Sequence, residues 1–117
     1  MPAKNRRWTL AARPHGLVKE SDFRFEEAPV PAPGDGEVLV RVLYLSFDPT
    51  QRGWIEDRPS YMPPVQIGEV MRASAVGEVV ESKHPGFAKG DLVQGLFGWQ
   101  EYALLPAALL GPNAKIP

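Results

Sequence analysis

The amino-acid sequence predicts a mainly β fold, a barrel or sandwich built from six or more short strands. The chain has 117 residues, and 13 prolines and 11 glycines interrupt it every few positions. Proline breaks helix interiors and cannot donate to a strand ladder, so this spacing argues against long helices. No stretch keeps the hydrophobic period of a helix for more than two turns. Short strands joined by turns are what such a chain forms.

The strongest strand signal is the segment 37–47, in which valines occupy one face and leucines the other. Apolar residues on both faces predict a central strand that is covered on both sides. The other strands are expected within 6–12, 23–28, 67–82, 92–97 and 99–105, with 67–82 broken into two pieces at Gly68 and Gly77.

Two kinds of connection are expected between these strands. Alternating prolines at 29–33 predict an extended connector. The segments Gly34-Asp35-Gly36 and Gly90-Asp91 predict turns, since glycine adopts positive φ without strain.

Length and composition point to one domain, 1–117, able to bury about two-thirds of its unfolded surface. The formal charge of −1 gives no reason to expect a nucleic acid or an anionic membrane as partner. The basic cluster Lys4, Arg6 and Arg7 is interpreted as a solvated N-terminal arm. The chain has no cysteine, which excludes disulfides, thiolate nucleophiles and cysteine-type zinc sites. Without a secretory signal or a membrane-length apolar run, it is expected to be cytoplasmic.

The segment 44–64 follows the strongest strand and is too irregular for one long helix or strand. Such stretches in compact domains are usually binding loops, so it is predicted to form the wall of a small-molecule pocket. A short helix is expected after Asp48, with Asp48 as N-cap and Pro49 in the first helical position. Arg52 either holds a phosphate or carboxylate or pairs with Asp48 and pins the loop. Tyr61 either offers its phenol to a bound carbonyl or anchors a turn.

Sequence motifs for nucleotide and metal sites are absent. The sequence contains neither a G-x-G-x-x-G turn after a strand nor a P-loop, and it has no H-E-x-x-H. His15 and His84 lie in turns rich in proline and glycine, and both are expected to be exposed. No metal site is predicted.

Neighbouring acidic residues give no acid–base pair. Glu26-Glu27 and Glu56-Asp57 are adjacent, so on a strand their side chains would point to opposite sides. They are interpreted as solvated loop or edge charges. Trp99 and Tyr102 are expected in the core rather than in a pocket. No catalytic residue is assigned from these patterns.

Six motifs nevertheless stand in one order. They are Asp48-Pro49-x-x-Arg52-Gly53-Trp54, Tyr61-x-Pro63-Pro64-Val65, Gly68-x-x-Met71, Val76-Gly77-x-Val79-x-x-Ser82, Phe87-x-x-Gly90-Asp91-x-Val93-x-Gly95 and Gly98-Trp99-Gln100-Glu101-Tyr102. Together with 29–42, they resemble the N-terminal half of the zinc-independent medium-chain dehydrogenases/reductases. The most similar branch comprises the leukotriene B4 12-hydroxydehydrogenase/prostaglandin reductases, plant double-bond reductases and curcumin reductase-like enzymes. The resemblance covers residues 5–117.

This resemblance implies a GroES-like, partly open β-barrel. Family enzymes use NADPH to reduce the C=C bond of α,β-unsaturated aldehydes and ketones, with hydride delivered to the β-carbon. The resemblance also implies a substrate-binding set, with Tyr61 as the best candidate for substrate contact. The positions are Asp48, Pro49, Thr50, Arg52, Tyr61 and Met71. Thr50 stands where many relatives have tyrosine.

In the family, a Rossmann domain follows and holds NADPH, whereas the 117 residues contain none of it. The chain is therefore expected to be the substrate-side domain of an alkenal or enone reductase, binding no cofactor by itself and inactive alone. Its partners would be a small hydrophobic enone or enal and a separate Rossmann domain. The alternative is a free-standing, non-enzymatic GroES-like module that binds a small hydrophobic ligand or self-associates.

Overall fold

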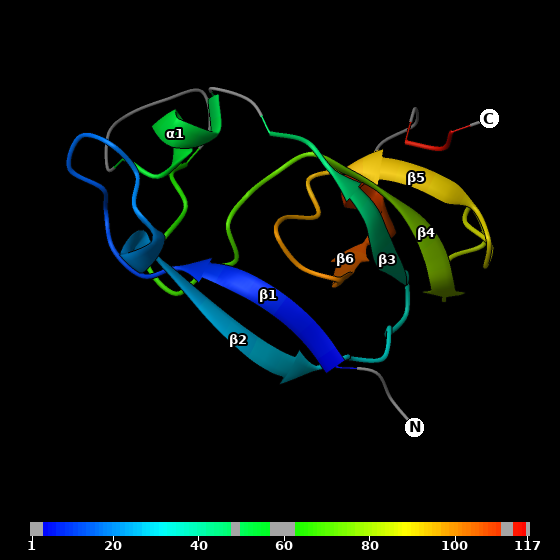
Figure 1. Cartoon of the computed structure of the whole chain (residues 1–117). Coiled ribbons are helices and arrows are strands. Elements are labelled where there is room, and N and C mark those ends of the chain that lie inside the picture. Colours follow the sequence, from blue (N-terminus) through cyan, green and yellow to red (C-terminus); the bar gives the residue numbers. More distant parts are fainter. Residues whose placement is uncertain (1–3, 48–49, 57–62, 111–113, 117) are drawn as a thin grey trace.

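A computed structural model of the chain describes residues 4–47, 50–56, 63–110 and 114–116 (Figure 1). Its elements are β1 (Lys4–Leu10), β2 (Phe23–Pro29), β3 (Glu37–Leu45), α1 (Thr50–Trp54), β4 (Ala75–Ser82), β5 (Leu92–Gly95) and β6 (Tyr102–Pro106), with 3₁₀ helices at Glu20–Asp22 and Ala107–Leu109. The mainly β prediction is confirmed, because the longest helix in the described part of the chain has five residues.

The strands form two antiparallel sheets. β1 and β2 make a hairpin, and the second sheet has the order β5-β4-β3-β6. In Figure 1 the hairpin lies to one side of the larger sheet, with α1 above it. The sheets are open and do not close into a complete barrel, in agreement with the partly open barrel that was predicted.

Backbone hydrogen bonds between distant segments hold the two sheets together. Trp8 N–H donates to the Trp99 carbonyl at 2.9 Å, and Met71 N–H donates to the Trp8 carbonyl at 3.0 Å. Trp99 N–H in turn donates to the Met71 carbonyl at 2.9 Å. The hairpin is therefore anchored to the segments that lead into β4 and β6.

Strand β3 is central, as predicted, but it is covered over only half its length. Val38, Leu39 and Val40 are buried, whereas the residues from Leu43 onward are exposed. Strand β6 pairs with β3 only as far as Arg41, so the far half loses its neighbour on that side. The apolar pattern on both faces correctly predicted a central strand, but the apolar residues after Arg41 are not buried.

The predicted break at Gly77 is wrong, because β4 runs without interruption through that residue. A Cβ added to Gly77 would lie 2.4 Å from Val40 Cγ1 and 2.7 Å from the Arg41 carbonyl oxygen. The glycine therefore permits close approach of β4 to β3 rather than ending the strand. The first predicted piece, near Gly68, forms no strand, although it is hydrogen-bonded to β1 and makes an isolated bridge between Val70 and Thr9.

Two clusters of buried side chains form the core. The first lies on the larger sheet and is rich in valine; it consists of Val38, Val40, Ala75, Val79, Val93, Phe97, Ala103, Ala107, Leu110 and Ala114. The second joins the hairpin to α1 and consists of Leu10, Trp54, Ile55, Val65 and Met71. This second core cluster fixes α1 against the rest of the molecule.

The basic N-terminal residues are not a solvated arm, because β1 begins at Lys4. Each of the three pairs with a glutamate: Lys4 with Glu27 at 3.5 Å, Arg6 with Glu101 at 2.7 Å and Arg7 with Glu26 at 2.8 Å. The antiparallel register places Arg7 directly opposite Glu26. These edge charges are thus paired across strands rather than simply solvated.

The predicted turns are confirmed, with φ of +76° at Gly36 and +96° at Gly90. Within the described segments, no helix is long and apolar enough to cross a membrane.

Candidate functional site

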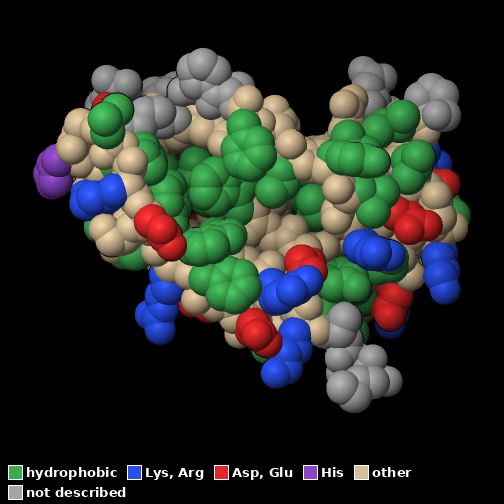
Figure 2. Space-filling view, in the orientation of Figure 1, with side chains coloured by type: hydrophobic (Ala, Val, Ile, Leu, Met, Phe, Trp, Pro, Cys, Tyr) green, Lys and Arg blue, Asp and Glu red, His purple; other side chains and the backbone are tan. Residues whose placement is uncertain are grey.

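The far end of β3 exposes large apolar side chains. Tyr44 is 74% exposed and Phe47 is 75% exposed, and Leu43 and Leu45 are also exposed. Figure 2 shows hydrophobic side chains over the β1–β2 hairpin and beside β5, with the surface hollowed between them. A concentration of exposed apolar groups of this kind usually marks a ligand or protein interaction site.

Two grooves flank this end of β3. The first, of about 420 Å³, lies against the ends of β4 and β5, and its wall combines Tyr44, Leu45 and Leu96 with Ser46 and Ser74. The second, of about 490 Å³, lies between the hairpin and β3. Leu45 lines both grooves, so they meet at β3.

Aromatic rings line the second groove. The Trp8 and Phe25 ring centroids are 5.2 Å apart, and Phe47 meets Trp99 edge-on at 5.9 Å. Trp99 also packs on Phe23 at 5.1 Å and against the second core cluster. The prediction that Trp99 belongs to the core is therefore incomplete, since one side of its ring is groove wall.

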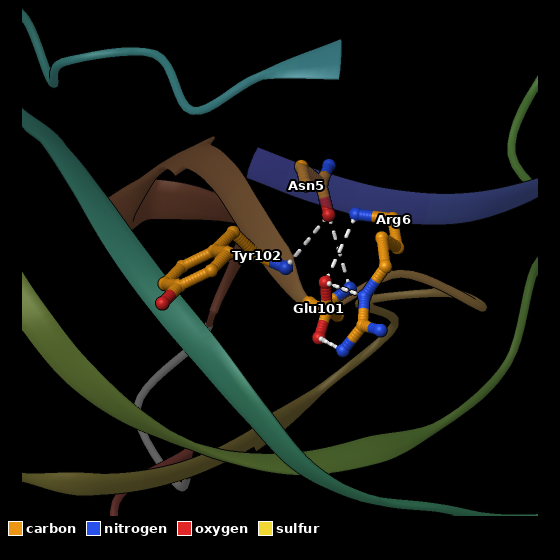
Figure 3. Close-up of polar contacts among 4 residues, drawn as sticks. All are labelled: Asn5, Arg6, Glu101 and Tyr102. Atoms are coloured by element: carbon orange, nitrogen blue, oxygen red, sulfur yellow. Dashed lines mark hydrogen bonds and ion pairs between the residues drawn. The ribbon is translucent and has the colours of Figure 1, made fainter. Parts of the chain in front are cut away.

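An ion pair forms the polar rim of the second groove (Figure 3). Arg6 donates from Nε and Nη2 to the two Glu101 carboxylate oxygens, at 2.8 and 2.7 Å. The backbone N–H of Arg6 also donates to Glu101 Oε1, at 3.1 Å. These hydrogen bonds, with the Arg6 charge, lower the pKa of Glu101 to about 2. Glu101 is therefore ionised across the neutral pH range.

Asn5 fixes the backbone beneath this rim. Its side chain is 4% exposed, and Oδ1 accepts from the N–H groups of Glu101 and Tyr102, each at 3.0 Å. Nδ2 donates to Gln100 Oε1 at 2.9 Å. In Figure 3 the Tyr102 ring points away from this network, so its backbone rather than its phenol takes part.

Helix α1 is tied to the end of β3. The Gln51 side chain is buried and its Nε2 donates to the Ser46 carbonyl. Trp54 belongs to the second core cluster, and its carbonyl accepts from Val65 N–H at 2.8 Å. The short helix predicted after Asp48 is confirmed, whereas the proposed cap itself lies outside the described residues.

The predicted substrate-binding residues fall into three groups. Asp48, Pro49 and Tyr61 lie outside the described residues. Thr50 and Arg52 are on α1, where the structure describes their backbone only. Met71 is 1% exposed and lies in the second core cluster, so contact between Met71 and a substrate stays a prediction.

Some groove-lining residues, Tyr44, Leu45, Ser46 and Phe47, belong to the segment 44–64 that was predicted as a pocket wall, whereas those from other segments were missed. Trp8, Phe25 and Phe47 are far apart in sequence, and only the pairing of the hairpin with the rest of the molecule brings them together. A usable signal was present in and just after β3, because apolar residues continue past Arg41 through Leu45, the last residue of β3, to Phe47.

The histidines are structural or exposed. His15 is exposed in its turn, while His84 is half-buried and its Nδ1 accepts from Gly86 N–H at 2.9 Å. Among the described residues, no group of three or more acidic, histidine or cysteine side chains could hold a metal ion.

Comparison with protein-family models identifies the family to which this domain belongs. The family model described as the N-terminal domain of oxidoreductase matches residues 6–111. The chain belongs to this family. The zinc-independent branch predicted from the six motifs is confirmed, since its relatives include curcumin, alkenal and prostaglandin reductases.

Among the relatives, the NADPH-dependent curcumin reductase of Escherichia coli is 54% identical over 99 residues, which cover 85% of this chain and 29% of that enzyme. The NADP⁺-dependent 2-alkenal reductase of Nicotiana tabacum is 36% identical over 94 residues, or 77% of this chain and 27% of that enzyme.

The solved structures agree. The crystal structure of CurA from Vibrio vulnificus has a TM-score of 0.86 at 40% identity, covering 95% of this chain and 32% of that chain. The structure of CurA in complex with NADPH has a TM-score of 0.81 at 37% identity, and the match covers 91% of this chain and 36% of that chain. The chain thus spans about a third of the length of the relatives it matches.

Proposed function

We propose that this chain is the substrate-side domain of an NADPH-dependent reductase that acts on the C=C bond of α,β-unsaturated aldehydes and ketones, in the cytoplasm. The observation that supports this is the pair of apolar grooves meeting at Leu45, on a domain related to curcumin and alkenal reductases. A mostly apolar cleft with a few polar groups suits an enone, which is hydrophobic apart from one carbonyl.

In this proposal the chain binds and orients the alkene. The apolar walls at Leu45 and Leu96 would exclude water from the conjugated bond. Tyr44, Ser46 and Ser74 carry the hydroxyl groups beside the first groove, and these can donate to a carbonyl oxygen. The substrate-binding set Asp48, Pro49, Thr50, Arg52, Tyr61 and Met71 remains part of the same proposal.

The cofactor would be held elsewhere. NADPH supplies the hydride, and transfer requires it to lie in contact with the alkene. The chain has no glycine-rich turn for a dinucleotide. We therefore propose that a separate Rossmann domain binds NADPH, and that this chain alone neither holds the cofactor tightly nor turns over substrate.

The test is to complete this chain with the remainder of the E. coli curcumin reductase, here called the completed reductase, and to follow NADPH consumption with enones and enals. We expect turnover by the completed reductase and none by the chain alone. A folded completed reductase that reduces no enone or enal would overturn the function. For the chain alone, NADPH titration followed by tryptophan fluorescence should give a Kd of about 1 mM or weaker. Micromolar binding would overturn the division between the two domains.

A second candidate function is a non-enzymatic module that self-associates or binds a small hydrophobic ligand. The exposed Tyr44, Phe47, Leu96 and Leu109 favour it, because apolar surface of this extent promotes association. Sedimentation velocity at several concentrations tests it. A strictly monomeric chain with no ligand in its native mass spectrum would exclude this function.

A further inference from the structure

Arg72 joins helix α1 to the segment that returns after it. Its Nη2 donates to the Pro63 carbonyl at 2.6 Å, and its Cζ lies 5.4 Å from the centroid of the Trp54 ring. One guanidinium therefore contacts both the last residue of α1 and the chain as it comes back. The Trp54 carbonyl and Val65 N–H are hydrogen-bonded beside it, at 2.8 Å.

Arg72 is half-buried, and stability alone does not explain why its Nη1 is enclosed. Its Nη1 is buried with no hydrogen-bond partner in the part of the chain that the structure describes. A buried donor without a partner destabilises the folded state, and a methionine would cover the Trp54 ring without that penalty. What a methionine cannot provide is the directed hydrogen bond to Pro63.

The backbone that carries Arg72 is rigidly held. Met71, the preceding residue, is hydrogen-bonded through its N–H to Trp8 and through its carbonyl to Trp99. A Cβ on Gly98 would lie 2.9 Å from the Met71 carbonyl oxygen, so these segments are in close contact. Arg72 thus extends from a backbone segment that is hydrogen-bonded on both sides, between the two sheets.

Contacts lead from Arg72 to both grooves. Trp54 and Gln51 are on the same short helix, and Gln51 donates to the Ser46 carbonyl at the end of β3. Ser46 lines the first groove, and the next residue, Phe47, lines the second. Displacement of α1 would therefore move the walls of both grooves.

We propose that Arg72 is a positioning residue for the substrate site: it holds α1 against the returning segment and so fixes the end of β3. The role of this site in binding substrate rests on the proposed function. Arg72 itself lines neither of the two grooves and acts on them through Trp54 and Gln51.

The test compares Arg72→Met with Arg72→Lys, which keeps the charge over Trp54 but loses the planar fork. Arg24→Met is the matched control, since Arg24 is exposed on β2. Hydrogen exchange of the chain alone should quicken about fivefold or more at α1 and Val65 in Arg72→Met. The exchange rates of Arg72→Lys should lie between those of the wild type and Arg72→Met, and the exchange rates of Arg24→Met should match those of the wild type.

In the completed reductase, Arg72→Met should raise KM for the enone about tenfold and leave Kd for NADPH unchanged. Arg72→Lys should recover part of the KM. A purely structural role would instead lower Tm and the active fraction without changing KM, and that result would overturn the proposal.

Three further outcomes are decisive. Unchanged exchange at α1 in Arg72→Met would show that Arg72 does not hold the helix. If Arg72→Met fails to fold, the Arg72→Lys variant tests the proposal instead. Wild-type exchange rates and a wild-type KM in Arg72→Lys would show that the planar guanidinium is not required, and the proposal would be overturned. If the wild-type completed reductase shows no turnover, the proposed function fails, while exchange in the chain alone still decides whether Arg72 holds α1.

Discussion

Arg6 and Glu101, which are 95 residues apart in sequence, form two parallel hydrogen bonds of 2.8 and 2.7 Å. They connect β1 to the residue that precedes β6, at the rim of the aromatic groove. The same contact therefore links the hairpin to the larger sheet and sets the charge at one edge of the candidate site.

This pair predicts a loss of stability in acid. The Arg6 hydrogen bonds lower the folded-state pKa of Glu101 from 4.5 to about 2. The stabilisation is complete above the unfolded-state pKa and is lost as pH falls towards the folded-state value. In urea titrations the free energy of unfolding should decline from about pH 5 downwards, and Glu101→Gln should flatten part of that decline. At neutral pH the substitution should cost about 1 kcal/mol, because solvent screens the pair.

Glu81→Gln is the control, since Glu81 is exposed on β4. It should leave the pH dependence unchanged. Superimposable curves for Glu101→Gln and the wild type would show that the ion pair does not contribute to acid stability.

Asn5→Ala should destabilise the junction of the two sheets. The substitution leaves the N–H groups of Glu101 and Tyr102 without their acceptor in a partly buried setting. Two unsatisfied donors should lower the free energy of unfolding by about 2–4 kcal/mol. Chemical denaturation measures it, with Gln100→Ala as the comparison. A smaller loss for Asn5→Ala than for Gln100→Ala would contradict this assignment.

Gly77→Ala should destabilise the larger sheet. The new methyl would overlap Val40 and the Arg41 carbonyl, so β4 would have to move away from β3. Overpacking of this kind costs about 1–3 kcal/mol. In Gly34→Ala the added Cβ would lie 3.2 Å from the flexible Glu37 carboxylate, so that variant should stay near the wild-type Tm. Equal melting temperatures for the two variants would rule out the proposed close packing.

Removing the exposed rings of the aromatic groove should weaken substrate binding without unfolding the chain. Phe25 is 50% exposed and Phe47 is 75% exposed, so a Phe25→Ser/Phe47→Ser double variant should keep most of its stability. In the completed reductase it should raise KM for an enone about tenfold, because apolar contact area is lost. Leu17→Ser, at a residue 92% exposed and not part of either groove, should leave KM unchanged. Equal KM values for the two variants would place the substrate elsewhere.

Local sequence signals predicted the elements well where the physical cause is local. The turns at Gly36 and Gly90 need positive φ, and both have it. The segment 37–47 contains β3 because alternating branched residues suit a strand. Gly77 was misjudged because a glycine that ends a strand and one that allows two strands to approach look alike in sequence.

The candidate site was harder to predict from the sequence. The six ordered motifs correctly indicated the family, and the segment 44–64 was predicted as the wall of the pocket. Phe47 lies in that segment, but its grouping with Trp8 and Phe25 in one groove was not foreseen, because the three belong to different strands or their ends and share no sequence motif. Arg72 also stood outside every motif, although it contacts both Trp54 and Pro63.

By itself, the sequence determined the mainly β class, the position of the central strand and the oxidoreductase family, because turn chemistry, alternation and motif order are written in neighbouring residues. Only the tertiary structure decided which apolar residues are core and which are groove wall. Val40 and Leu45 have similar side chains on one strand, yet β6 covers β3 only up to Arg41. Burial depends on which segments pack against a residue, and those segments are distant in sequence.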